Sequence, residues 1–222
     1  LGPAACIEAS SQVELYDPIL SEELPCGLSF HTSEPWESDA GTLMEQLDSI
    51  REYFSKWVGD AFPVALGGEH GILPPLLNAA QHHPLVNGNM KQLTVVQIDA
   101  HADLREQLDG EKYSHACAAS RSLDLGIGQL IQIGIRAYSK QEADYIEMDE
   151  RVTTFFARDT QSPSNGESAW SSCLDTLGKL TGPVHLTIDI DGLDGSLVPA
   201  TGTPVPGGLS FWQATEVIEA VF

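Results

Sequence analysis

Alternation of short apolar runs with helix-forming segments constrains the fold of this chain more than any other feature. Runs rich in Val, Ile and Leu are separated by stretches with helical spacing of apolar residues. Strands that are apolar on both faces are typical of parallel sheets covered by helices on either side. We therefore expect an α/β protein, a three-layer α/β/α fold with a mostly parallel central sheet. The expected strands lie at residues 13–17, 62–66, 93–98, 130–135, 152–156 and 184–190.

The expected helices follow from apolar spacing and from proline positions. They lie at residues 4–10, 39–58, from about 73 onward, 140–147, 167–180, and from about 210 to the end of the chain. Residues 18–36, rich in Pro, Ser and Glu, are expected to form a loop. The chain of 222 residues contains no internal repeat, low-complexity tract or linker. We therefore expect a single domain over residues 1–222.

The charge balance excludes several classes of partner. The chain has 32 acidic and 11 basic residues, a formal net charge of -21. Such a chain repels nucleic acid and anionic membrane surfaces, so neither is expected as a partner. A cationic substrate or carboxylate-bound metal ions fit the sign, although the same surplus also keeps a protein dispersed, and both explanations remain open. The 4 cysteines lack metal-site spacing, which indicates reduced thiols and a cytoplasmic location.

One expected strand ends in an unusual way, because the apolar run at residues 93–98 leads directly into the sequence DAHAD. In extended backbone, alternate side chains lie on the same face. Asp99, His101 and Asp103 can therefore converge, with only alanines between them. A surface loop is the alternative interpretation of so short a motif. Three acid or imidazole groups at the exit of a buried strand are costly without a cation.

Two other expected strands end with the same kinds of residue. Asp189 and Asp191 lie at the end of the strand at 184–190, and His70 follows two glycines after the strand at 62–66. Ligands of α/β sheets bind at the carboxyl ends of the strands. Carboxylates and imidazoles without a thiolate suit Mn(II), Fe(II) or Co(II) better than structural zinc. These ligands are too many for one catalytic ion with an open position, so the sequence predicts a two-metal site.

Three motifs together resemble the ureohydrolases, the binuclear manganese enzymes that include arginase, agmatinase and formiminoglutamase. They are GGEH at 67–70, DAHAD at 99–103 and TIDIDGLDGSLVPATGTPVPGGL at 187–209, in the family order. The resemblance covers nearly the whole chain and implies an arginase-like fold with two Mn2+ ions per subunit. The resemblance implies that His70 and Asp103 bind one ion and that His101 and Asp191 bind the other. It also implies that Asp99 and Asp189 bridge both ions. The implied metal ligands are His70, Asp99, His101, Asp103, Asp189 and Asp191.

The resemblance also implies two catalytic residues beside the metals. A metal-bridging hydroxide would attack the guanidinium carbon of the substrate. Asp194 would hold this hydroxide or the tetrahedral intermediate by a hydrogen bond, and His115, whose usual pKa range suits proton transfer, would deliver a proton to the leaving amine. Gly195 stands where the family usually has Pro, which loosens the loop that carries Asp194. Cys117 as a thiol nucleophile is the weaker alternative, because the metal site already supplies a nucleophile.

The resemblance is strongest to agmatinases, which implies hydrolysis of agmatine to putrescine and urea by a homo-oligomer, trimeric or hexameric. Arg105 occupies the position at which arginases carry an Asn that binds the α-carboxylate of arginine. Guanidinobutyrate, guanidinopropionate and arginine remain alternative guanidino substrates. A catalytically inactive subunit with this fold and a single-zinc amidohydrolase are the alternatives from other classes.

Both ends of the chain differ from the pattern of the family. Family members have a strand before the equivalent of residues 2–10, and a further strand, with a Glu that grips the substrate guanidinium, after the equivalent of the last helix. We therefore expect a fold truncated at both ends, a fragment of a longer protein.

Overall fold

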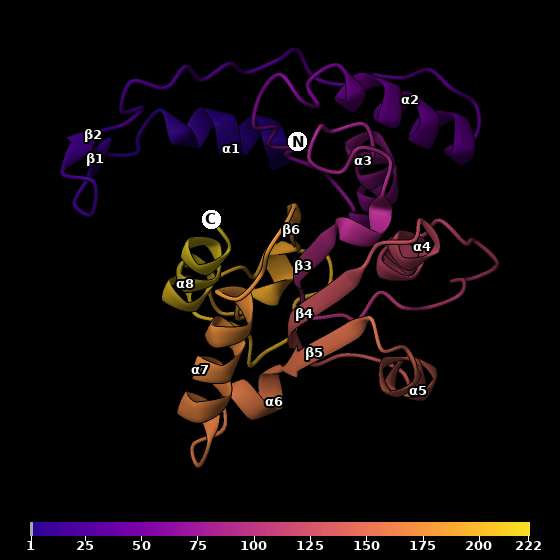
Figure 1. Ribbon diagram of the computed structural model, residues 1–222, viewed down its shortest axis with the longest axis vertical. Coiled ribbons are helices and arrows are strands. Elements are labelled where there is room, and N and C mark those ends of the chain that lie inside the picture. Colours follow the sequence, from indigo (N-terminus) through magenta and orange to yellow (C-terminus); the bar gives the residue numbers. More distant parts are fainter. Residues whose placement is uncertain (1) are drawn as a thin grey trace.

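A four-stranded parallel sheet lies at the centre of the protein in the computed structural model, which describes residues 2–222 (Figure 1). Its order is β5-β4-β3-β6, and β3 pairs in parallel with β4 and with β6. The strands are β3 (Thr94–Ile98), β4 (Gln129–Ile135), β5 (Val152–Phe156) and β6 (Val184–Ile188). The expected strands at 93–98, 130–135, 152–156 and 184–190 are therefore confirmed to within a residue or two.

Helices cover both faces of the sheet, which confirms the three-layer α/β/α arrangement (Figure 1). On one face lie α3 (Leu73–Ala80), α4 (Ala118–Asp124) and α5 (Lys140–Met148); on the other lie α6 (Ala157–Thr160), α7 (Gly166–Leu177) and α8 (Phe211–Val221). Val95 belongs to the core on the α3 and α4 side, whereas its neighbour Val96 packs on the α7 and α8 side. Because alternate residues of β3 enter two different cores, the strand is buried along its whole length. Within residues 2–222 no helix is long and apolar enough to cross a membrane.

The connections between strands single out the carboxyl ends of β3 and β6 as a place for a binding site. From β3 the chain runs through α4 to β4 and then through α5 to β5, on one side of β3. It then returns through α6 and α7, on the other face, to β6 on the opposite side of β3. The direction of winding reverses between β3 and β6, and ligands of open α/β sheets bind at such a point.

The first third of the described chain lies outside this sheet (Figure 1). Helix α1 (Gly2–Ser10) contributes no buried residue, and the two-residue strands β1 (Tyr16–Asp17) and β2 (Glu22–Glu23) pair with each other. Helix α2 (Leu43–Ser55) packs on α3, where Phe54 contacts a small core. It begins later than the expected residue 39, because the Thr42 side chain accepts a hydrogen bond from the Glu45 N–H and caps the helix.

The expected strand at residues 62–66 is wrong. The segment forms no strand, and its apolar side chains Phe62 and Val64 are 72% and 73% exposed. A strand needs a neighbour for its backbone hydrogen bonds, and β6 pairs only with β3 among the described residues. At residues 13–17, only the last two residues are extended in a strand, and the short helix α6 was not expected.

Leu77 on α3 offers a test of the first core. Its side chain is 0% exposed and packs against the sheet. We expect Leu77→Ala to lower the free energy of unfolding by about 2–5 kcal/mol, because lost burial and the resulting cavity add. Leu85 is 65% exposed, so Leu85→Ala should change the same quantity by less than about 0.5 kcal/mol. Urea unfolding of both variants measures this, and equal losses would contradict the packing described.

Candidate metal centre

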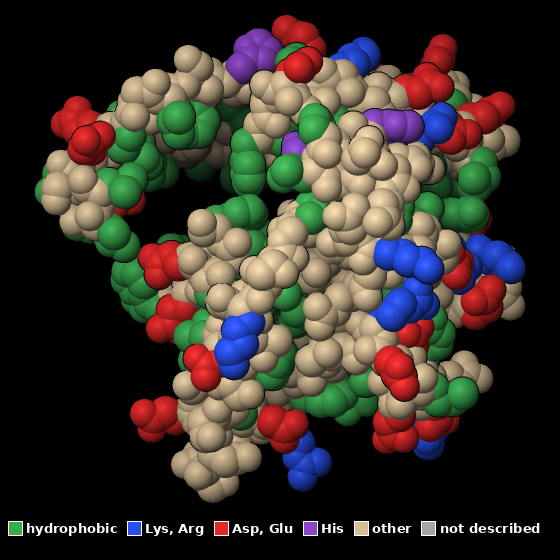
Figure 2. All heavy atoms as spheres, in the orientation of Figure 1, with side chains coloured by type: hydrophobic (Ala, Val, Ile, Leu, Met, Phe, Trp, Pro, Cys, Tyr) green, Lys and Arg blue, Asp and Glu red, His purple; other side chains and the backbone are tan. Residues whose placement is uncertain are grey.

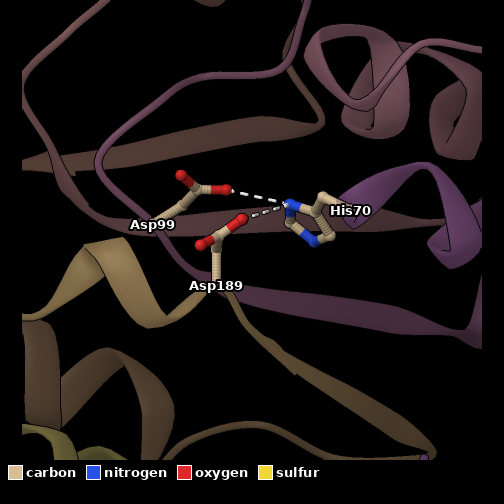
Figure 3. A group of neighbouring side chains, drawn as sticks. All are labelled: His70, Asp99 and Asp189. Carbon is tan, nitrogen blue, oxygen red and sulfur yellow. Dashed lines mark ion pairs between the residues drawn. The ribbon is translucent and has the colours of Figure 1, made fainter. Parts of the chain in front are cut away.

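Carboxylates from two neighbouring strands converge on His70 at the edge between β3 and β6 (Figure 3). Asp99 directly follows β3, Asp189 directly follows β6, and His70 begins the short 3-10 helix η1 (His70–Ile72). His70 Nδ1 lies 3.0 Å from Asp99 Oδ2, 2.9 Å from Asp103 Oδ2 and 3.9 Å from Asp189 Oδ2. The structure thus brings four of the predicted ligands into one buried group.

A second group shares Asp99 with the first. His101 Nδ1 lies 3.1 Å from Asp191 Oδ2 and 3.6 Å from Asp99 Oδ1. Each of the groups His70–Asp99–Asp189 and Asp99–His101–Asp191 has ligand atoms within 4.8 Å of one another. The DAHAD motif therefore does not direct all its side chains at one point. Asp103 turns toward His70 from a left-handed backbone with φ 53°, whereas His101 faces Asp191.

Backbone and hydroxyl donors orient the carboxylates. Asp99 Oδ1 accepts a hydrogen bond from the His101 N–H at 2.7 Å, and Asp191 Oδ1 accepts one from the Ala100 N–H at 3.1 Å. The Thr203 hydroxyl donates to Asp191 Oδ2 at 2.9 Å. These bonds leave the carboxylates of two strands facing each other, which is unfavourable unless positive charge lies between them.

The imidazoles supply that positive charge when no metal is bound. The neighbouring carboxylates of Asp191 and Asp99 raise the pKa of His101 to about 10. Burial alone would lower the pKa of His70, but Asp103 and Asp99 outweigh it and hold this pKa well above its usual range. Burial, together with the charge of Asp99, raises the pKa of Asp103 to about 6. The cluster therefore binds protons strongly, as a site built for cations does.

The residues present fit a divalent metal. His70 Nδ1 is buried and has no hydrogen-bond partner among residues 2–222, because its contacts with the carboxylates lack hydrogen-bond geometry. Its other nitrogen, Nε2, lies 2.9 Å from the Thr187 hydroxyl. An imidazole held from behind, with a free nitrogen aimed at carboxylate oxygens, has the arrangement of a metal-binding histidine. The oxygen-rich, thiolate-free donor set suits a hard or borderline cation.

The two predicted catalytic residues lie outside these groups. His115, at the start of η3 (His115–Cys117), is half exposed, and its Nδ1 is 3.3 Å from Glu69 Oε2. Asp194 accepts hydrogen bonds from Ser196 and from the N–H groups of Gly207 and Gly208, which lower its pKa. In this conformation both Asp194 oxygens are engaged by their own loop.

Sequence reasoning missed Arg136, which follows β4. Its guanidinium donates only to backbone carbonyls, including Asp191 O at 2.7 Å, Leu193 O at 3.1 Å and Val205 O at 2.6 Å. It thereby joins the loop that carries Asp191 to the loop that follows Val205. Only the sequence GIR hinted at this role, since an arginine at the end of an apolar strand must find many acceptors.

Fold and site together define the class: a three-layer α/β/α protein with a carboxylate and imidazole cluster at the sheet's winding reversal. Residues 1–222 match the family model described as Arginase family. The chain is 36% identical to N(1)-aminopropylagmatine ureohydrolase from Synechocystis over 100% of its own length and 70% of that protein. It is 34% identical to agmatinase from Bacillus cereus, over 99% of its length and 71% of that protein.

Among solved structures, the agmatine ureohydrolase of Thermoplasma volcanium is similar with a TM-score of 0.80 and 26% identity, over 99% of this chain and 70% of that one. The chain belongs to the arginase family. The resemblance seen in the sequence motifs is therefore confirmed at the level of family, arginase-like fold and ureohydrolase type of enzyme.

Gly192 tests the close contact between the two strand ends. A Cβ at this position would lie 2.7 Å from Ile98 Cγ2 and 2.8 Å from the Asp99 backbone nitrogen. We expect Gly192→Ala to lower the free energy of unfolding by about 1–3 kcal/mol, because the loop of Asp191 must move away from β3. Gly202→Ala is the matched control, since nothing lies within 4 Å of its Cβ position. Urea unfolding of the metal-free protein measures both, and an unaffected Gly192→Ala protein would contradict the contact.

Proposed function

We propose that this chain is a manganese-dependent ureohydrolase that hydrolyses the guanidinium group of agmatine to putrescine and urea. The observation that carries the proposal is the pair of ligand groups that share Asp99 at the winding reversal of the sheet. Two groups with one shared carboxylate suit two adjacent cations better than one. Membership of the arginase family supports a guanidino substrate.

In this proposal, His70 and Asp103 hold one Mn2+ ion, and His101 and Asp191 hold the other. Asp99 and Asp189 would be shared between the two. Asp99 offers Oδ2 to the His70 side and Oδ1 to the His101 side, which supports a bridging role. When bound, the ions would supply a water of lowered pKa as the nucleophile at neutral pH. The negative groups around them would also attract the cationic guanidinium.

The protein's own residues would deliver a proton to the leaving amine and hold the loop that carries Asp191. Attack of water on the guanidinium carbon forms a C–O bond, and the C–N bond to the alkyl amine breaks once that nitrogen takes up a proton. His115 is the proposed donor, and its half-exposed ring beside Glu69 supports exchange of protons with solvent. The four hydrogen bonds that Asp194 accepts support a role in holding the loop of Asp191. A direct bond from Asp194 to the attacking water stays a prediction.

N(1)-aminopropylagmatine is the second candidate substrate, because several of the curated relatives carry that name. It extends agmatine by an aminopropyl group and therefore by one further positive charge at neutral pH. The formal net charge of -21 favours polycations in general and does not separate the two. Guanidinobutyrate and guanidinopropionate carry a carboxylate, which the acidic site disfavours. A homo-oligomer and a cytoplasmic location stay predictions.

Urea release separates these substrates. The Mn(II)-loaded protein should release urea from agmatine, and the rate should be compared with rates for N(1)-aminopropylagmatine, arginine, guanidinobutyrate and guanidinopropionate. Asp99→Asn should lower the rate roughly a thousandfold or more, because it weakens the charge that holds both cations. Asp175→Asn, an exposed substitution on α7, is the control and should leave the rate unchanged.

A preference for N(1)-aminopropylagmatine would keep the chemistry and change the substrate. No urea from any compound, with two metals bound per chain, would contradict the proposed reaction. Full activity of Asp99→Asn would contradict the proposed centre.

Metal removal gives an independent measurement. Dialysis against a chelator should abolish urea release, and Mn(II) should restore it with two ions bound per chain. Because metal binds the folded state, saturation at about a thousand times Kd should add about 4 kcal/mol of stability. Calorimetry with and without Mn(II) measures this as a rise in Tm. An unchanged Tm together with a metal content of one or zero would contradict a two-ion centre.

A further inference from the structure

A row of polar side chains crosses the whole sheet just below the proposed metal centre. In the register of the strands, Gln97 on β3 is paired with Thr187 on β6 and with Gln132 on β4, and Gln132 is paired with Thr154 on β5. Paired residues of neighbouring strands point to the same face. Gln97 and Thr187 each stand two residues before an aspartate that follows their strand, so the row lies directly beneath Asp99 and Asp189.

Burial of these polar side chains costs free energy unless their polar groups are hydrogen-bonded. Gln97 and Gln132 are both 0% exposed. In the neighbouring row on the same face, the three positions on β3, β4 and β5 are Val95, Leu130 and Val152, which are buried and apolar, and the β6 position is His185. Buried amides among apolar side chains must be fully hydrogen-bonded, and they then impose a unique arrangement on their surroundings.

Three hydrogen bonds form a chain that runs along the row from Thr154 to Asp99. The Thr154 hydroxyl donates to Gln132 Oε1 at 3.1 Å, and Gln132 Nε2 donates to Gln97 Oε1 at 2.9 Å. Gln97 Nε2 then donates to Asp99 Oδ2 at 2.8 Å. A second bond from Gln132 Nε2 to Ala102 O, at 2.7 Å, holds the backbone of the DAHAD segment. Each glutamine oxygen accepts a hydrogen bond from the neighbour farther from Asp99. Each amide nitrogen therefore points along the row toward Asp99.

The other end of the row holds the histidine. The Thr187 hydroxyl lies 2.9 Å from His70 Nε2. When this hydroxyl accepts the Nε2 proton, Nδ1, beside Asp99 and Asp103, is the nitrogen left to bind a metal ion in place of its proton. The row therefore holds both His70 and Asp99 by hydrogen bonds, through Thr187 and Gln97.

We propose that the row Thr187–Gln97–Gln132–Thr154 positions His70 and Asp99 for metal binding, and that Gln97 and Thr187 are positioning residues of the centre. Neither contacts the substrate or the reacting atoms. The proposal rests on the proposed metal-dependent function, and it specifies which uncharged residues set the geometry of one half of the centre.

The test measures Mn(II) affinity directly, by titration of the metal-free full chain followed by electron paramagnetic resonance, so that no substrate is needed. Gln97→Leu removes the donor to Asp99 and keeps the volume of the side chain. We expect it to weaken Mn(II) binding by roughly 10–100-fold, the usual effect of losing a group that orients a metal ligand. Tm of the metal-free protein should fall modestly, because Gln132 and Asp99 each lose one hydrogen-bond partner.

Thr187 supplies a matched pair. Thr187→Val removes the hydroxyl and should weaken Mn(II) binding by roughly tenfold or more, whereas Thr187→Ser keeps the hydroxyl and should retain the wild-type affinity. Ile131→Val is the control for packing, because Ile131 lies on the opposite face of the sheet. It should lower Tm without changing the Mn(II) affinity.

The outcomes distinguish a failure of the proposed function from a failure of the proposed positioning role. A wild-type protein that binds no Mn(II) would refute the proposed function. A wild-type protein that binds Mn(II), with Gln97→Leu and Thr187→Val equal to it in affinity, would refute the positioning role and leave the proposed function standing. A loss of Tm in these variants without a loss of affinity would assign the row to structural stability only.

Discussion

The convergence of carboxylates in a buried space is the constraint on which the rest of the structure depends. Asp99, Asp103 and Asp191 are almost completely buried, and Asp189 lies beside them. Buried like charges repel one another strongly. In the absence of metal, the raised pKa values of His70 and His101 let two protonated imidazoles offset this repulsion. Loss of either imidazole would leave uncompensated negative charge in this space.

The winding of the sheet creates the place where this convergence is possible. At the reversal between β3 and β6, the chain segments that follow these two adjacent strands diverge to opposite faces and leave room at the edge. Gly192 lets the segment after β6 approach β3 within the reach of Asp99, and Arg136 ties the same segment to the end of β4 through backbone carbonyls. The loop that carries Asp191 is therefore held by backbone groups and by the half-buried guanidinium of Arg136.

Much of this arrangement was predictable from local pattern. The strands that lead to Asp99 and Asp189 are rich in Val, Ile and Leu, and such segments identify buried parallel strands whatever their neighbours. The strand at 62–66 failed for the same reason that the others succeeded: apolar composition reports burial or pairing, and this segment has no strand beside it among the described residues. The resemblance of three short motifs to the ureohydrolases supplied the division of ligands, which the distances around His70 and His101 support.

The sequence by itself determined which residues could bind a cation and that they would gather at strand ends, because residue type and the two-residue period of a strand are local properties. It also determined the family, since the motifs occur together and in order. Only the tertiary structure decided that Asp103 turns to His70 while His101 turns to Asp191, and that Gln97 and Thr187 meet in one row beneath them. These facts depend on strand order and register, which arise from packing between segments far apart in the chain and leave no signal within any one of them.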